Sequence, residues 1–234
     1  MKEKFLAIAL CLMVLIASCA KDNYEPPQSD FSGRLVYQGQ PIGIRNAAFK
    51  MELWQRGFGN FGVIDVNVNQ EGKFSSKLFD GNYKFTVSNG QVPFLWPKNT
   101  AGRPDSIDVN LAGNKTLDLE VRPYYMIRNA VITIAGGKVN ATCALEKIIT
   151  DANGKDLESV SLYINKTQFV DADGTNNIAK QELSGAALAN LASLSMSVDI
   201  PTISPTQNYV FARVGAKIAG VEHMIFSPLV KLTF

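Results

Sequence analysis

The chain contains 234 residues, with 23 basic and 21 acidic side chains and a formal net charge of +2. This near balance, with no basic stripe and no Arg-rich run, excludes the electrostatic footprint of nucleic-acid binding, so no nucleic-acid partner is predicted. Cys11 and Cys19 belong to the N-terminal segment, which leaves only Cys143 as an internal thiol, so apolar burial rather than disulfides has to stabilise the fold.

Residues 1–18 are predicted to be a secretory signal peptide. Lys2 and Lys4 precede an uncharged run from Phe5 to Ala17. This run has the length of a signal-peptide core, whereas a membrane-spanning helix needs roughly 20 apolar residues. Small residues lead into Cys19, in a pattern that resembles the lipobox of bacterial lipoproteins. The resemblance implies that the peptide is cut before Cys19 and that its thiol carries the lipid anchor.

Residues 19–30 are predicted to be a lipidated, polar tether, in which Pro26 and Pro27 favour extended backbone. Residues 31–122 are predicted to form a first β-sandwich, because apolar and polar side chains alternate along short segments. Asp80-Gly81 is the sharpest hairpin signal between these segments. Seven strands are expected, at 31–37, 48–55, 62–68, 73–79, 82–88, 105–111 and 116–122.

Residues 123–234 are predicted to form a second sandwich, similar to fibronectin or immunoglobulin domains. Cys143 shares one strand face with aliphatic neighbours, which predicts a buried structural thiol. The stretch from Ser184 to Leu191 resembles a helix with Ser184 as its N-cap. Strands are expected near 139–145, 160–164, 194–200 and 209–214, with a closing hairpin partner at 224–234. The whole chain is therefore predicted to be all-β, with two consecutive β-sandwich domains.

No catalytic pattern emerges, so neither enzyme activity nor a cofactor is predicted. The single histidine, His223, has no Asp or Ser at an informative spacing, and motifs of the Gly-x-Ser-x-Gly, His-Glu-x-x-His and Cys-x-x-Cys types are absent. The loop Asp171–Asn177 carries alternating oxygen ligands of the kind that bind calcium. Its Gly174 is displaced from the EF-hand position, so a turn-rich loop is favoured, and calcium binding stays open.

Aromatic residues outside the apolar strand faces are the candidate binding residues. Trp54 falls on the charged face of the strand at 48–55, and Phe94 and Trp96 lie in a loop between two prolines. Phe58, in a glycine-rich run with Phe61, is a weaker candidate. Rigid exposed aromatic rings suit the apolar faces of sugars, so Trp96, Phe94, Trp54 and Phe58 are predicted to contact a glycan. The alternative is that Phe94 and Trp96 fold inward or cover the seam between the domains.

Three segments resemble a Bacteroidetes lipoprotein family of unknown function, namely residues 19–27, 31–36 and 80–87. Members of that family are typically encoded beside SusD-like glycan-binding lipoproteins and their TonB-dependent partners. The Gly81-Asn82-Tyr83 segment is similar to the transthyretin-like, carboxypeptidase-regulatory sandwich. Residues 209–216 resemble the penultimate strand of fibronectin-like domains.

The resemblance implies a non-catalytic accessory lipoprotein of a polysaccharide-utilisation system, anchored by lipid in the outer membrane. Lys21-Asp22 resembles the short signal that directs such lipoproteins to the cell surface, although Asn23 departs from that pattern and leaves a periplasmic orientation open. The implied partners are a glycan and SusD-like or TonB-dependent transporter proteins. The alternative is an interaction module that docks such a transporter without binding sugar.

Overall fold

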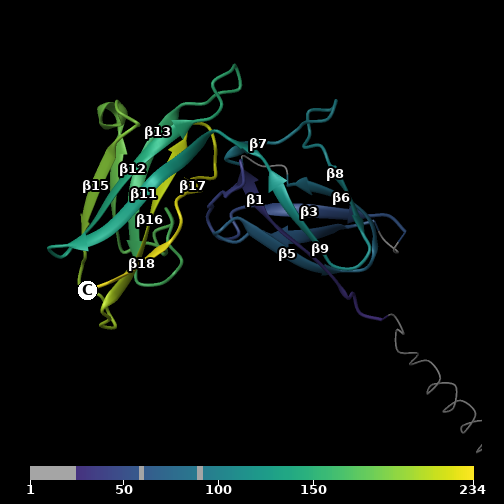
Figure 1. Ribbon diagram of the computed structural model, residues 1–234, viewed down its shortest axis with the longest axis horizontal. Coiled ribbons are helices and arrows are strands. Elements are labelled where there is room, and N and C mark those ends of the chain that lie inside the picture. The colour runs from purple at the N-terminus through teal and green to yellow at the C-terminus, as the bar shows by residue number, and fades with distance from the viewer. Residues whose placement is uncertain (1–24, 58–60, 89–91) are drawn as a thin grey trace, which may run out of the picture.

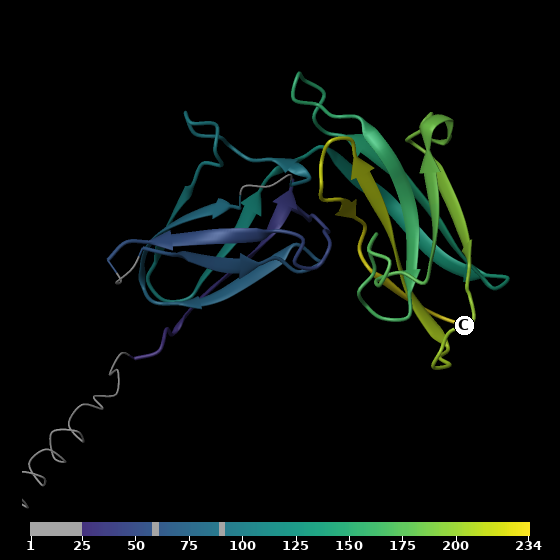
Figure 2. The same ribbon diagram turned by 180° about the vertical axis from the view of Figure 1, so that it is seen from behind.

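The computed structural model describes residues 25–57, 61–88 and 92–234, which form two β-sandwiches lying side by side (Figure 1). The same arrangement seen from behind shows the chain passing once from the first sandwich to the second (Figure 2). Cys19 and Phe58 lie outside the described residues. Within the described part of the chain, no helix has the length and apolar character needed to cross a membrane.

The first sandwich contains the seven predicted strands, each within two residues of its expected ends. One sheet has the order β4 (Val63–Asn67), β3 (Lys50–Gln55), β6 (Gly81–Val87), β8 (Ile107–Leu111). In the other sheet, β1 (Ser29–Tyr37) pairs antiparallel with β5 (Lys73–Leu78) and β2 (Gln40–Pro41), and parallel with β9 (Lys115–Glu120). A short pair, β7 (Phe94–Leu95) and β10 (Arg122–Pro123), closes the end that leads to the second sandwich.

The predicted hairpin at Asp80-Gly81 is wrong. Strand β5 pairs with β1, whereas β6 pairs with β3 and β8, so the chain crosses from one sheet to the other at this turn. Asp80 Oδ1 accepts hydrogen bonds from Ser29 Oγ and from the Gly113 amide, and these bonds lower the pKa of Asp80. The turn residues therefore mark a reversal of the chain, but they do not determine which strands become neighbours.

The second sandwich also has two sheets. The first contains β11 (Tyr125–Ala135), β12 (Lys138–Lys147) and β15 (Leu194–Asp199). The second contains β14 (Ala179–Ser184), β13 (Leu157–Asn165) and β16 (Tyr209–Ile218), and both β17 (Ile225–Phe226) and β18 (Val230–Thr233) pair with β16. The closing hairpin expected at 224–234 is confirmed.

The predicted helix from Ser184 to Leu191 is wrong. Ser184 has extended backbone at the end of β14, its side chain makes no capping hydrogen bond, and only a 3₁₀ turn at Gly185–Leu188 follows. Gly185 has a φ of +55°, a conformation in which glycine lacks the steric penalty of other residues. The segment is thus a tight turn between two strands.

The junction between the sandwiches is a packed interface. Apolar residues of both sandwiches belong to one continuous buried cluster. The Phe226 amide donates to the Gly43 carbonyl oxygen at 2.9 Å, and a Cβ added to Gly43 would lie 2.5 Å from the Phe226 oxygen. The two backbones therefore touch where only glycine fits.

Arg213, on β16, is 1 % exposed at this junction. Its Nη1 donates to the Ile44 carbonyl oxygen of the first sandwich at 2.9 Å, and its Nε donates to the Val170 carbonyl oxygen. The guanidinium also stacks on the Phe226 ring, 3.9 Å from the ring centroid. Burial lowers the pKa of Arg213 to about 10. One side chain thus joins a strand of the second sandwich to a loop of the first.

Cys143 is buried, as predicted, and burial raises the pKa of its thiol from 9.0 to about 11. Between these two values the unfolded chain releases a proton that the folded chain retains, so this contribution to stability is complete below pH 9 and is lost as the pH rises toward 11. We expect the free energy of unfolding to fall by at most about 2 kcal/mol from this thiol between pH 8.5 and 10.5. Urea titrations under reducing conditions measure it.

The Cys143→Ala variant is the control, because it lacks the titrating thiol while retaining every tyrosine. Its free energy of unfolding should decline less steeply over the same pH range. An identical decline in the two proteins would contradict the assignment of this pH dependence to Cys143.

Candidate functional site

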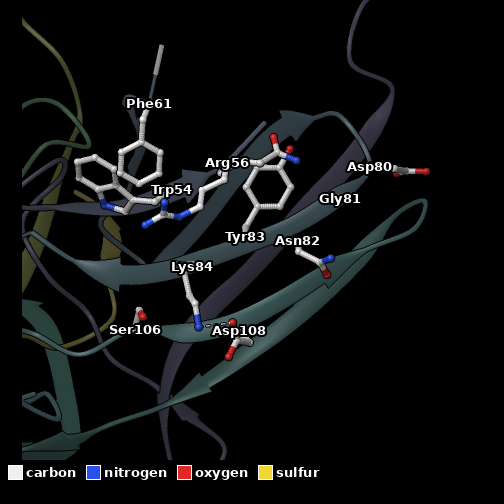
Figure 3. Close-up of a pocket in the computed structure, with 11 residues that line it drawn as sticks. Trp54, Arg56, Phe61, Asp80, Gly81, Asn82, Tyr83, Lys84, Ser106 and Asp108 are labelled. Carbon is white, nitrogen blue, oxygen red and sulfur yellow. Dashed lines mark ion pairs between the residues drawn. The ribbon is translucent and has the colours of Figure 1, made fainter. Parts of the chain in front are cut away.

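An open groove of about 830 Å³ lies on the outer face of the sheet formed by β4, β3, β6 and β8. Strand alternation places its side chains. On β3, Leu53 is buried in the core while Trp54 points outward, and on β6 Tyr83 is buried while Asn82 and Lys84 remain outside. Figure 3 shows these outward side chains gathered above the sheet.

The aromatic part of the groove consists of Trp54 and Phe61. Their ring centroids are 5.3 Å apart at an interplanar angle of 35°, and Phe61 is 57 % exposed. The planar guanidinium of Arg56 lies beside these two rings, with its Cζ 5.2 Å from the centroid of the Phe61 ring (Figure 3). Trp54 Nε1 donates to Glu52 Oε2 at 3.1 Å, which fixes the indole orientation. The groove therefore presents aromatic faces rather than a free indole N–H.

Polar side chains of β6 and β8 line the groove beside these rings. Lys84 Nζ is 2.6 Å from Asp108 Oδ1, and Asn110 Nδ2 donates to Asn82 Oδ1 at 2.6 Å. Asp80 lies at the far end of the groove, where Ser29 and Gly113 already bond its carboxylate (Figure 3). The arrangement combines an apolar stacking surface with a polar rim, as small-molecule sites commonly do.

The structure separates the predicted aromatic candidates. Trp54 points outward from its strand, as predicted, and lines the groove. Phe94 is 2 % exposed and packs edge-on against Phe49 with centroids 5.7 Å apart, which is the inward alternative. Trp96 is partly buried, and its Nε1 donates to the Asp105 carbonyl oxygen at 2.8 Å. Phe58 falls outside the described residues, although Phe61 of the same run completes the groove.

Trp96 lines a second cavity of about 1190 Å³ at the junction of the two sandwiches. Arg122, Tyr124 and Lys155 also line this cavity, and Lys155 Nζ lies 5.9 Å from the Tyr124 ring centroid. Trp54 and Trp96 are thus in different cavities and do not form one platform.

His223 packs beside an aromatic ring, and the Asp171 carboxylate of the Asp171–Asn177 loop is hydrogen-bonded within that loop. His223 is half-buried with its ring centroid 5.8 Å from that of Phe49, and burial lowers its pKa. In the loop, Asp171 Oδ1 accepts from the Asp173 amide at 2.8 Å and Asp171 Oδ2 from Asn176 Nδ2 at 3.0 Å. Across residues 25–57, 61–88 and 92–234, no group of three or more His, Cys, Asp or Glu could hold a metal ion.

Arg56 is one of the groove residues that the sequence pattern did not indicate as binding residues, as are Asn82, Lys84 and Ser106. It directly follows the end of β3 and has no periodic neighbour, so neither alternation nor motif spacing points to it. The one feature of the sequence that could have pointed to Arg56 is its position between two aromatic candidates, Trp54 and Phe58.

Two family models together match nearly the whole described chain. Residues 29–122 match the N-terminal domain of a protein of unknown function, DUF3823, and residues 125–231 match the domain of unknown function DUF3823_C. A DUF3823 family structure from Parabacteroides merdae is 34% identical, with a TM-score of 0.75 over 89% of this chain and 100% of that one. No curated protein matches the chain.

Two further structures have the same fold. A DUF3823 family protein from Bacteroides ovatus is 26% identical, with a TM-score of 0.76 over 88% of this chain and 99% of that chain. A structure from Bacteroides uniformis described as a "putative carbohydrate binding protein" is 15% identical, with a TM-score of 0.66 over 89% of this chain and all (100%) of that chain. At this identity the last comparison shows similarity of fold alone.

Proposed function

Because the chain belongs to the DUF3823 family and spans both of its domains, we propose that it is a non-catalytic, glycan-binding accessory protein whose binding site is the Trp54–Phe61 groove. The family itself has no established function. The description of the Bacteroides uniformis structure as a carbohydrate-binding candidate is in line with this proposal.

The observation that carries the proposal is the pairing of half-buried Trp54 with exposed Phe61 beside a polar rim (Figure 3). Pyranose rings have apolar C–H faces that pack on aromatic rings, and hydroxyl groups that need hydrogen-bonding partners at their edges. Asn82, Lys84 and Ser106 supply such partners within the same groove.

A binding role accounts for the carboxylates better than glycoside hydrolysis does. A glycosidase needs two carboxyl groups that face the scissile bond, one of them able to donate a proton. In the groove, Asp108 is paired with Lys84, and the pKa of Asp80 is lowered by its bonds to Ser29 and Gly113. A carboxyl group with a lowered pKa is a poor proton donor at neutral pH.

The proposed setting is the outer membrane, with the lipid on Cys19 as anchor and the groove facing the cell surface. Strand β1 begins at Ser29, so only a short segment separates that cysteine from the first sandwich. A glycan held there would be close to the SusD-like and TonB-dependent proteins that we propose as partners in polysaccharide utilisation.

The Trp54→Ala variant should lose at least tenfold in glycan affinity, about 1.4 kcal/mol, because it removes the larger stacking surface of the groove. Affinity electrophoresis through gels containing polysaccharides identifies a retained ligand, and calorimetry measures its affinity. Trp54 is outside the core, so thermal unfolding should show that the variant remains folded.

Trp96→Ala is the matched control, because it removes the other tryptophan from the separate junction cavity. Loss of binding in Trp96→Ala with unchanged binding in Trp54→Ala would move the site to the junction. No binding by the unsubstituted protein, together with capture of a SusD-like protein, would favour the docking role instead.

A further inference from the structure

The Trp54–Phe61 groove presents several hydrogen-bond donors to a ligand. One oxygen of each carboxylate and the Asn82 carbonyl oxygen are already engaged: Asp80 Oδ1 by Ser29 and Gly113, Asn82 Oδ1 by Asn110, and Asp108 Oδ1 by Lys84. The amide nitrogen of Asn82 and two of the three ammonium protons of Lys84 remain for a ligand. A ligand rich in acceptors is therefore complementary to this surface.

Arg56 adds further hydrogen-bond donors to the groove. Among the described residues, its guanidinium has no ion-pair or hydrogen-bond partner, and its one specific contact is with the face of the Phe61 ring. A contact between a guanidinium and the face of an aromatic ring uses none of its N–H groups as conventional hydrogen-bond donors, so these remain for a ligand. In Figure 3 the Arg56 side chain extends beside Trp54 and Phe61, over the same part of the groove.

The carboxylates of the groove are not paired with Arg56. The charge of Asp108 is offset by Lys84 at 2.6 Å. Asp80 lies at the opposite end of the groove and is bound by an amide and a hydroxyl (Figure 3). Within the part of the chain that the structure describes, Arg56 is thus the groove cation without a carboxylate partner, and it lies next to the stacking surface where a sugar ring would sit.

We propose that the groove prefers an acidic saccharide, whose ring stacks on Trp54 while its carboxylate or sulfate group binds the edge of Arg56. This inference rests on the proposed glycan-binding function and adds the substrate class and the residue that selects it. Arginine is suited to this role because its planar fork binds carboxylate in a bidentate manner.

The experiment compares polygalacturonate with the same polymer after methyl esterification, which removes the charge and keeps the sugar backbone. Alginate and chondroitin sulfate extend the acidic set, and amylopectin and xyloglucan represent neutral glycans. We expect the full protein to bind at least one acidic glycan about tenfold more tightly than its neutral counterpart. Raising the salt concentration from 50 to 500 mM should weaken the acidic interaction alone, because added salt screens exposed charges.

Arg56→Met should remove most of the acidic preference, so that the variant binds acidic glycans and their neutral counterparts with similar affinity. Arg103→Met is the matched control, because it makes the same change in net charge outside the residues that line the groove. Equal binding of acidic and neutral glycans, or equal losses in Arg56→Met and Arg103→Met, would overturn the acidic preference and leave glycan binding itself intact. Absence of binding to every glycan would overturn the proposed function, and the preference with it.

Discussion

Replacing Gly33 with alanine is expected to lower the free energy of unfolding by about 3 kcal/mol or more. Gly33 lies in the middle of β1, opposite Phe74 of β5 and Leu117 of β9. A Cβ at this position would be 1.9 Å from the Leu117 carbonyl oxygen and 2.7 Å from Phe74 Cζ. The phenyl ring can move, but the carbonyl belongs to the sheet, so β1 and β9 would have to separate.

Tryptophan fluorescence during urea unfolding measures this effect. Both tryptophans of the chain, Trp54 and Trp96, belong to the first sandwich, so the signal reports on the sandwich that contains Gly33. Gly174→Ala is the control, because a Cβ there has no neighbour within 4 Å and the backbone is not in the left-handed region. That variant should be as stable as the unsubstituted protein. Equal urea midpoints for Gly33→Ala and Gly174→Ala would contradict the described pairing of β1 with β9.

Replacing Arg213 with alanine should lower the free energy of unfolding by about 3–5 kcal/mol. The substitution leaves the buried carbonyl oxygens of Ile44 and Val170 without their donor. It also opens a cavity beside the Phe226 ring, on which the guanidinium stacks. Arg213→Met retains most of the volume and buries no charge, so its loss should be clearly smaller.

The same variant tests whether the two sandwiches unfold together. Arg213 belongs to the second sandwich, whereas Trp54 belongs to the first and lies outside the junction cavity, so in a Trp96→Phe background the fluorescence responds only if the junction couples the two. We expect the fluorescence transition and the circular dichroism transition to shift to lower urea together. A shift of the circular dichroism transition with the fluorescence transition unchanged would show that the Ile44 contact does not link the stabilities.

The strands were predictable because their information is local. Alternation with period two fixed the ends of seven strands in the first sandwich and the outward direction of Trp54. It missed β11, in which a register shift between Arg128 and Val131 and a φ of +52° at Asn129 interrupt the alternation. Strand pairing was less accessible, because a turn such as Asp80-Gly81 looks the same whether the next strand joins the same sheet or the facing one.

Side chains buried by distant parts of the chain could not be placed from sequence. Arg213 alternates with Val210, Ala212 and Val214, which suggests an outward cation. In the structure Arg213 is buried, and its guanidinium donates a hydrogen bond to the carbonyl oxygen of Ile44, which lies 169 positions away in the sequence. The burial of Phe94 was not predictable either, because the sequence of a loop has no regular alternation that tells buried side chains from exposed ones. Of the groove residues, the outward position of Trp54 follows from strand alternation, whereas the position of Arg56 does not.

The position of β1 has a mechanical consequence for a chain held at its N-terminus. The strand that directly follows the N-terminal segment is flanked along its length by β5 on one side and β9 on the other. A pull on residues before Ser29 acts parallel to β1 and nearly perpendicular to its ladder hydrogen bonds. Such a force loads many ladder hydrogen bonds at once instead of breaking them one by one, which makes β1 resistant to being pulled out of its sheet.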